Sequence, residues 1–294
     1  MYRRRIVNYK KNHSPHEKPV IKYDQGRKVS NPNRITTNQH VIPIAHLREW
    51  LGANQLLNVF DRKVGDWSTP DLDNAFTVQR LWDQKTEVDL LGANERNYQI
   101  QVDRVKKGLP IEQHDHISAY FAMLVVRHTV AQRPRPDEPS ILEDVSEPFS
   151  QEQLEQIELG NLGSPVPIVF PGGLGSQVLA RITVAMSMSM EFVRHAGRFS
   201  GVRWTPVAMD ADDAILPDSV ARLEGRRVVL LPMSPRVVLV GSRGNSLIAA
   251  QNRYTPADIN GMLLRSAERR FVVSERTCDA APSWLLSQPP RRLR

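Results

Sequence analysis

Apolar residues recur at helical spacing in several stretches, and these stretches predict the helices of the fold. The clearest helix covers residues 115–132, where Ile117, Phe121, Leu124 and Val125 share one face. A short extended entry followed by a helix is expected over 38–52, and longer helices over 86–107, 176–195 and 256–270.

The helix expected over 176–195 has an apolar face that predicts a core position. Its Met-Ser-Met-Ser-Met stretch is more typical of an adaptable core than of a groove for a partner. The face comprises Val178, Ile182, Ala185, Met186, Met190 and Val193.

Runs of β-branched and apolar residues predict strands, most of them in the second half of the chain. Residues 56–62 and 66–69, joined by a turn at Val64-Gly65, predict a hairpin in the first half. Helices lead and strands follow without strand–helix alternation, which favours an α+β fold. We expect a helical N-terminal half with a β-hairpin, and mixed or antiparallel strands in the C-terminal half. The later strands are expected at 202–209, 227–232, 236–241 and 271–275.

Two polar stretches divide the chain. Residues 1–34 hold few apolar side chains and predict a basic, disordered arm. Residues 137–175 are rich in acids and prolines, which predicts a connector with one short helix. Residues 176–280 are expected to form one composite domain with 35–136, and 281–294 form a tail.

The basic charge of the chain belongs to the arm. Residues 1–30 hold nine lysines and arginines against two acids, and the net charge of the chain is +7, so the rest sums to zero. A basic arm either neutralises phosphates of nucleic acid without sequence preference or is a solvated leader. The candidate nucleic-acid-binding residues are Arg3, Arg4, Arg5, Lys10 and Lys11.

Several classes of protein are disfavoured by what the sequence lacks. No apolar run reaches the roughly 18–20 residues that span a bilayer, and the N-terminus has no apolar signal region, so we expect a cytoplasmic protein. A lone cysteine, Cys278, makes no intramolecular disulfide and no multi-cysteine zinc site. The signatures of serine hydrolases, zinc proteases, dinucleotide-binding enzymes and kinases are absent.

Several segments, in order, resemble one family. They are Gln39-His40-Val41-Ile42-Pro43 leading into Leu47-Arg48, Val59-Phe60-Asp61-Arg62, and Pro232-Met233-Ser234-Pro235. Weaker correspondences are Asn74–Trp82, the acidic pair Asp89 and Glu95, Phe121–Pro136, Leu216-Pro217-Asp218-Ser219 and Ala267–Ser274. Together they resemble domain-of-unknown-function family 4238 over residues 39–275. Val41 replaces the family's aromatic residue, and only Asp218 is kept of its Ser-Asp-Asn-Pro motif.

The resemblance implies a fold family but no reaction, so the candidate side chains are judged by their chemistry. His40 precedes a proline that starts a helix, where a histidine serves as a general base, as a metal ligand or as a structural cap. Arg127 lies within an apolar helix and needs either an acidic partner such as Glu95 or an anionic ligand. Asp61-Arg62 at a strand end is typical of a local ion pair.

Acidic residues on the helix after residue 86 suggest a metal site. Glu95 and Asp103 are eight residues apart and lie closer on the helix surface than Asp89 and Glu95. With His40, such carboxylates would hold Mg²⁺ or Mn²⁺ for phosphodiester hydrolysis. A solvated helix face explains the same residues.

Two functions follow from these residues. One is a nucleic-acid-acting protein, such as a metal-dependent nuclease or a toxin or defence effector, with His40, Glu95, Arg127 and Asp218 as candidate catalytic residues. The other is a non-enzymatic interaction or scaffold module that docks a protein partner. The two differ in whether the four side chains meet in one pocket.

Overall fold

The chain forms two compact units, each assembled from segments far apart in sequence. The computed structural model describes residues 19–133, 150–160, 176–210, 213–219, 221–222, 228–243 and 254–279. Unit 1 comprises Met1–Gln39, Thr77–Ala93 and Thr129–Glu191; unit 2 comprises His40–Phe76, Asn94–His128 and Phe192–Arg294. Helices and antiparallel sheets occupy separate stretches, which confirms the α+β class. The predicted domain division remains a prediction, because most of 137–175 lies outside the described residues.

The start of the described chain is a β-hairpin, which the prediction of a disordered arm over 1–34 does not include; residues 1–18 of that arm lie outside the described residues. Strands β1 (Ile21–Asp24) and β2 (Arg27–Ser30) pair antiparallel. Gln25 and Gly26 join them with φ angles of 48° and 79°. Two consecutive residues with positive φ form the tight turn that fits the twist of a hairpin.

The hairpin segment is held by α4 (Gln151–Leu159), the short helix expected in the acidic connector. Glu155 accepts hydrogen bonds from the Val20 amide at 2.9 Å and from Asn33 Nδ2 at 2.7 Å. Lys22 forms an ion pair with Glu152. These contacts order a stretch whose composition alone predicts disorder.

A buried ion triad lies inside unit 1. Arg80 follows β6 (Thr77–Gln79), which pairs with β3 (Asn38–His40). Its Nη2 lies 2.9 Å from Oε1 of Glu158, and Nε of Arg181 lies 2.8 Å from the same oxygen. All three residues are at most 2% exposed.

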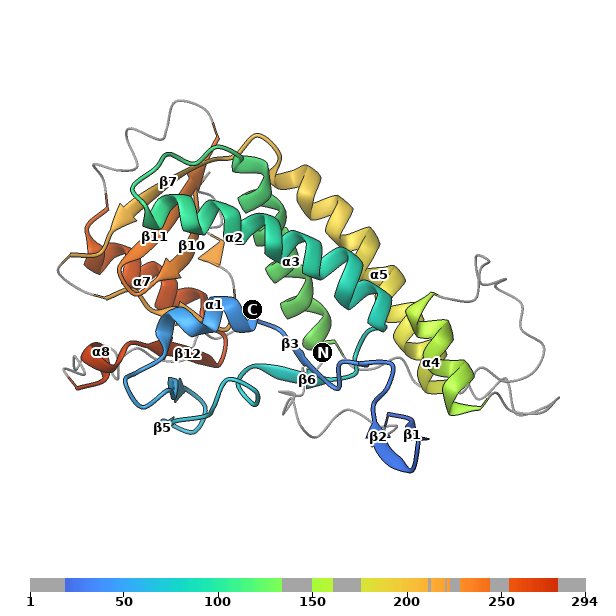
Figure 1. Cartoon of the computed structure of the whole chain (residues 1–294). Coiled ribbons are helices and arrows are strands. Elements are labelled where there is room, and N and C mark those ends of the chain that lie inside the picture. Colours follow the sequence, from blue (N-terminus) through green and yellow to red (C-terminus); the bar gives the residue numbers. More distant parts are fainter. Residues whose placement is uncertain are drawn as a thin grey trace, which may run out of the picture. The chain divides into compact units, whose positions relative to one another are not determined.

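The first sheet of unit 2 is antiparallel, in the order β7-β11-β10-β9. Figure 1 shows β7, β10 and β11 side by side, with α7 (Pro256–Ser266) next to them. Gly241 is required in this sheet, because a Cβ there would come within 2.8 Å of Val229 and 2.9 Å of Trp204. The strands are β7 (Arg203–Ala208), β9 (Ala221–Arg222), β10 (Val228–Ser234) and β11 (Val237–Ser242).

The second sheet of unit 2 has the order β5-β4-β12-β8 and is also antiparallel. Its β4–β5 ribbon confirms the predicted hairpin, and Gly65 in the turn has φ 74°. The strands are β4 (Asn58–Asp61), β5 (Asp66–Ser68), β8 (Leu216–Pro217) and β12 (Arg270–Val273).

Both faces of the second sheet are covered at its central strands, β4 and β12. Phe60 and Phe271 pack with residues of α7. Val59 and Val272, the neighbouring residues, face the other way and pack with α1 (Ile44–Leu47) and η1 (Arg48–Trp50). Successive side chains of a strand point to opposite faces, so a sheet covered on both sides has apolar residues in succession.

The central helices follow the prediction closely, with one irregular start. A π-helical turn, η2 (Thr86–Leu91), leads directly into α2 (Gly92–Lys106). The next helix is α3 (His114–Ala131), whose predicted apolar face is buried. The last described helix is α8 (Glu275–Asp279), which contains Cys278.

The long helix α5 (Ser176–Phe199) confirms the predicted element but not its buried face. Met186 is 58% exposed, and Met190 and Val193 are each 70% exposed. The buried apolar residues in this part of the helix are Val184, Ala185 and Met188, of which only Ala185 belongs to the predicted face. The prediction that Met186, Met190 and Val193 belong to the core is therefore wrong.

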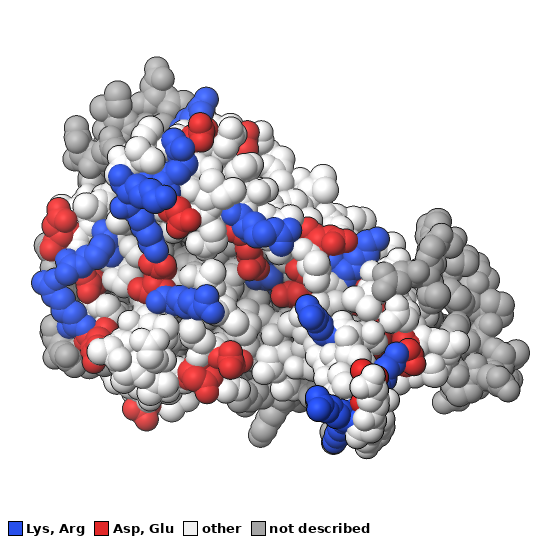
Figure 2. Space-filling model, viewed as in Figure 1, with Lys and Arg blue, Asp and Glu red and all other residues white. Residues whose placement is uncertain are grey.

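The described surface is mixed in charge. Figure 2 shows basic and acidic side chains interspersed over the viewed face rather than gathered by sign. Among the described helices, none combines the length and apolar content needed to cross a bilayer.

Candidate functional site

Gln39 and His40 of the opening motif (Gln39–Pro43) form hydrogen bonds to backbone groups of distant segments. Oε1 of Gln39 accepts hydrogen bonds from the amides of Leu81 at 2.7 Å and Trp82 at 3.1 Å, and Nε2 of Gln39 donates to the Trp82 carbonyl. His40 Nε2 donates to the Leu72 carbonyl at 2.9 Å. Because a carbonyl only accepts, this bond fixes the proton on Nε2. Of the alternatives for His40, these contacts favour the structural one.

The acidic partner expected for Arg127 is present. Nη2 of Arg127 lies 2.8 Å from Oε1 of Glu95, with side chains 1% and 27% exposed. The pair explains how an arginine is accommodated among the apolar residues of α3. Asp103 is exposed on the same helix, α2.

Asp218 accepts three backbone hydrogen bonds. Its carboxylate oxygens lie 2.8–3.0 Å from the amides of Glu268, Arg269 and Arg270 at the start of β12. Asp218 is 3% exposed, and burial raises its pKa despite these bonds and nearby His128. It has no hydrogen bond or ion pair with the other three candidates, so the four do not form one polar cluster.

His128 lies near two carboxylates, those of Asp218 and Glu268. Its Nε2 lies 3.4 Å from Oε1 of Glu268. Burial alone would lower the pKa of His128, but Glu268 and Asp218 outweigh burial and raise it. Arrangements of this kind occur both in acid–base sites and in structural ion networks.

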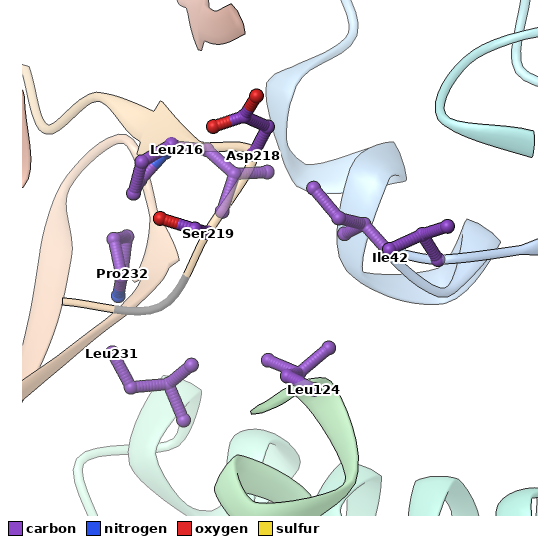
Figure 3. Close-up of a pocket in the computed structure, with 9 residues that line it drawn as sticks. Ile42, Leu124, Leu216, Asp218, Ser219, Leu231 and Pro232 are labelled. Atoms are coloured by element: carbon purple, nitrogen blue, oxygen red, sulfur yellow. The ribbon is translucent and has the colours of Figure 1, made fainter. Parts of the chain in front are cut away.

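A small cavity marks where several family-like motifs meet. Its lining includes Ile42 of the opening motif, Asp218 and Ser219, Pro232, and Leu124 of α3 (Figure 3). The cavity measures about 20 Å³, which is room for one water molecule and not for a substrate. The motifs therefore converge on a packed junction.

The Asp61-Arg62 segment contributes to the same junction, but not as a local pair. Asp61 lies 2.7 Å from Nη2 of Arg269 and 3.2 Å from Nε of Arg270. Nη1 of Arg62 donates to the Ala267 carbonyl at 2.7 Å. The predicted ion pair between Asp61 and Arg62 is wrong, because Asp61 pairs with Arg269 and Arg270 where β12 begins, and Arg62 donates to a carbonyl at the end of α7.

A second buried polar cluster involves a histidine that the sequence does not single out. His46 Nε2 donates to the Pro232 carbonyl at 2.6 Å, so its Nδ1 is free to accept from Tyr120 Oη at 2.8 Å. Tyr98 stacks on Tyr120 with ring centroids 3.8 Å apart. Burial lowers the pKa of His46 to about 4, with the Pro232 carbonyl opposing it. The imidazole is thus neutral and structural at neutral pH.

Among the described residues, no group of three histidine, cysteine or acidic side chains is placed to hold a metal ion. The expectation of Mg²⁺ or Mn²⁺ remains a prediction. Its proposed ligands His40 and Glu95 contact Leu72 and Arg127 instead.

An open groove lies in unit 1, between η2 and α5. This groove measures about 470 Å³ and is lined by ten residues. Its α5 wall carries the exposed Met186 and Met190. The π-helical turn forms the other wall, and such turns are often found at functional sites. The lining comprises Asp83, Lys85, Thr86, Asp89, Leu90, Ile182, Ala185, Met186, Ser189 and Met190.

The chain matches no family model, no curated protein and no solved structure. The resemblance to domain-of-unknown-function family 4238 remains a prediction.

The five candidate nucleic-acid-binding residues of the basic arm lie outside the described residues, so their role remains a prediction with a direct test. If it binds nucleic acid, replacing Arg3, Arg4, Arg5, Lys10 and Lys11 with serine removes up to five phosphate contacts. The slope of log K against log salt should then fall by about 4. Fluorescence anisotropy with labelled duplex DNA at several salt concentrations measures this. Equal slopes for both proteins would contradict the arm's role.

Proposed function

We propose that this protein is a non-enzymatic interaction module that binds a helical segment of a partner protein in the groove between η2 and α5. The observation that carries the proposal is the exposure of Met186 and Met190 along an open groove. Flexible, polarizable methionines are common on surfaces that adapt to helices of other proteins.

The contacts of the four candidate catalytic residues also favour a non-enzymatic function. Glu95 and Arg127 form an ion pair with each other. Asp218 accepts hydrogen bonds from backbone amides, and His40 donates one to a backbone carbonyl. The junction where the motifs meet encloses only about 20 Å³. These side chains have evident structural uses, whereas exposed methionines have none inside the fold.

Site-specific photo-cross-linking in cells tests the proposal. A benzophenone amino acid at position 190 should give a discrete adduct with one partner protein. The control carries the same amino acid at Ile100, a 54%-exposed apolar residue on α2. The partner is then purified, and its binding should weaken at least about tenfold in the Met186→Ser, Met190→Ser double variant, since loss of two buried methionines costs more than about 1.4 kcal/mol.

Three outcomes would contradict the proposal. The first is an adduct at position 190 no stronger than at position 100. The second is a cross-link within one chain, which would mean that the protein covers its own groove. The third is an adduct between two copies, which would make the groove a self-association surface.

A further inference from the structure

The dimensions of the groove limit the segment that it accepts. On α5, its lining runs from Ile182 through Met186 to Met190. Eight residues of helix rise about 12 Å, or a little over two turns. Residues spaced by four lie on one side of a helix, so the wall offers a continuous apolar stripe. A bound helix of matching length would present apolar anchors at positions i, i+4 and i+7.

The three charged side chains that line the groove are not equally available to a ligand. Lys85 lies over Gly160 at the end of α4, where a Cβ on that glycine would come within 3.0 Å of Lys85 Cδ and 3.4 Å of its Nζ. A lysine at the C-terminal end of a helix is stabilised by the helix dipole and its last carbonyls. The positive charge of Lys85 therefore lies near the end of α4 and also acts on Asp83.

The two carboxylates of the groove differ as well. Burial raises the pKa of Asp83, and its charge is partly offset by the Thr86 amide at 2.9 Å and by the charges of Lys85 and Arg181. Asp89 is exposed on the wall and makes no ion pair with a described residue. Asp89 is thus the charged side chain of this groove that is available to pair with a ligand.

We infer that the groove selects a cationic amphipathic helix, with apolar anchors against Met186 and Met190 and a lysine or arginine opposite Asp89. The inference rests on the proposed function and adds the chemistry of the partner. Apolar contact supplies most of the affinity, because a single exposed ion pair contributes only about 0.2–1 kcal/mol. The charge supplies the preference between partners.

Two matched peptides test the inference on the full chain. Both are labelled with fluorescein, contain about 15 residues so that they form helices, and carry leucine on one face. One has lysine on the other face and the second has glutamate. The lysine peptide should bind about tenfold more tightly. Asp89→Lys should weaken it about threefold to tenfold, which is the loss of one pair and the gain of one repulsion.

Variants of the groove locate the binding. The Met186→Ser, Met190→Ser double variant should bind the lysine peptide at least about tenfold more weakly. Ile100→Ser removes one exposed apolar side chain from α2 and serves as the matched control. Neither change alters charge, so a loss confined to the methionine variant reports apolar contact in the groove.

The outcomes separate the inference from the proposed function. If both peptides bind equally and the methionine variant loses both, the groove binds helices but the charge selection is overturned. If the lysine peptide binds the methionine variant as well as the unaltered protein, it binds elsewhere and the inference fails. If the cross-linked partner from cells binds through an acidic helix, the inference fails while the proposed function stands. Binding of vesicles of phosphatidylcholine in place of either peptide would overturn both.

Discussion

Replacing Glu158 with leucine should lower the free energy of unfolding by about 3–5 kcal/mol, because it leaves two buried guanidinium groups without their shared carboxylate. Arg80 and Arg181 are each at most 2% exposed, and both contact Oε1 of Glu158. A buried charge that loses its counter-ion keeps the full cost of its removal from water. Urea denaturation followed by circular dichroism measures the change.

Two further variants make this experiment decisive. Glu152→Gln on the same helix removes an exposed pair with Lys22 and should change stability by at most about 1 kcal/mol. A triple variant, Arg80→Met, Glu158→Leu and Arg181→Met, removes all three charges and should recover most of the loss. If Glu158→Leu unfolds no more readily than Glu152→Gln, the triad does not hold unit 1 together.

The sequence predicts the helices well because each carries its own signals. The helix α7 is capped by Thr255, whose side chain forms a reciprocal capping box with that of Asp258, and Pro256 occupies its first turn. Such caps lie within a few residues of the helix that they define. The same holds for α4, where Ser150 and Gln153 cap the start and Gly160 ends the helix.

What the sequence does not predict depends on contacts between distant segments. The residues of the ion triad are separated by 78 and 23 positions, and no periodicity joins them. The period of α5 predicts a helix, but its buried side depends on which neighbours pack against it, and so the methionine face is exposed. The β1–β2 hairpin is likewise ordered by Glu152 and Glu155, which follow it by more than a hundred residues.

The candidate site residues also differ in whether the sequence carries a signal for their contacts. The pairing of Arg127 with Glu95 follows from a simple rule, since a buried arginine requires an acid, and the structure confirms it. Asp218 gives no such signal, because its partners are backbone amides that any sequence possesses. His40 binds a carbonyl 32 residues away for the same reason. Residue types alone therefore suggest catalysis where the fold uses the side chains to hold backbone.

His46 predicts a loss of stability on acidification. Its pKa is lowered by burial to about 4 in the folded protein, against an ordinary value of 6.5. Between these values the unfolded chain takes up a proton that the folded chain does not, so the free energy of unfolding falls as pH falls. The loss begins near pH 6.5, is complete near pH 4 and amounts to about 3 kcal/mol.

His46→Gln tests this effect because glutamine keeps an N–H donor for the Pro232 carbonyl and does not titrate. Urea denaturation at pH 7 and at pH 4 gives the pH-dependent loss for each protein, and the loss should be smaller in the variant by about 3 kcal/mol. Other titrating groups, such as His128 and Asp218, contribute to both proteins and cancel in this difference.

If His46→Gln does not fold, NMR spectroscopy of the unaltered protein tests the lowered pKa of His46 directly. In the unaltered protein, ¹⁵N chemical shifts of the His46 ring should report the neutral tautomer with its proton on Nε2 from pH 7 to about pH 5. That tautomer follows from the Pro232 carbonyl on one side and the Tyr120 hydroxyl on the other. A ring that becomes protonated near pH 6.5 would contradict the burial argument, since water or a carboxylate would then have to reach a side chain that is 1% exposed.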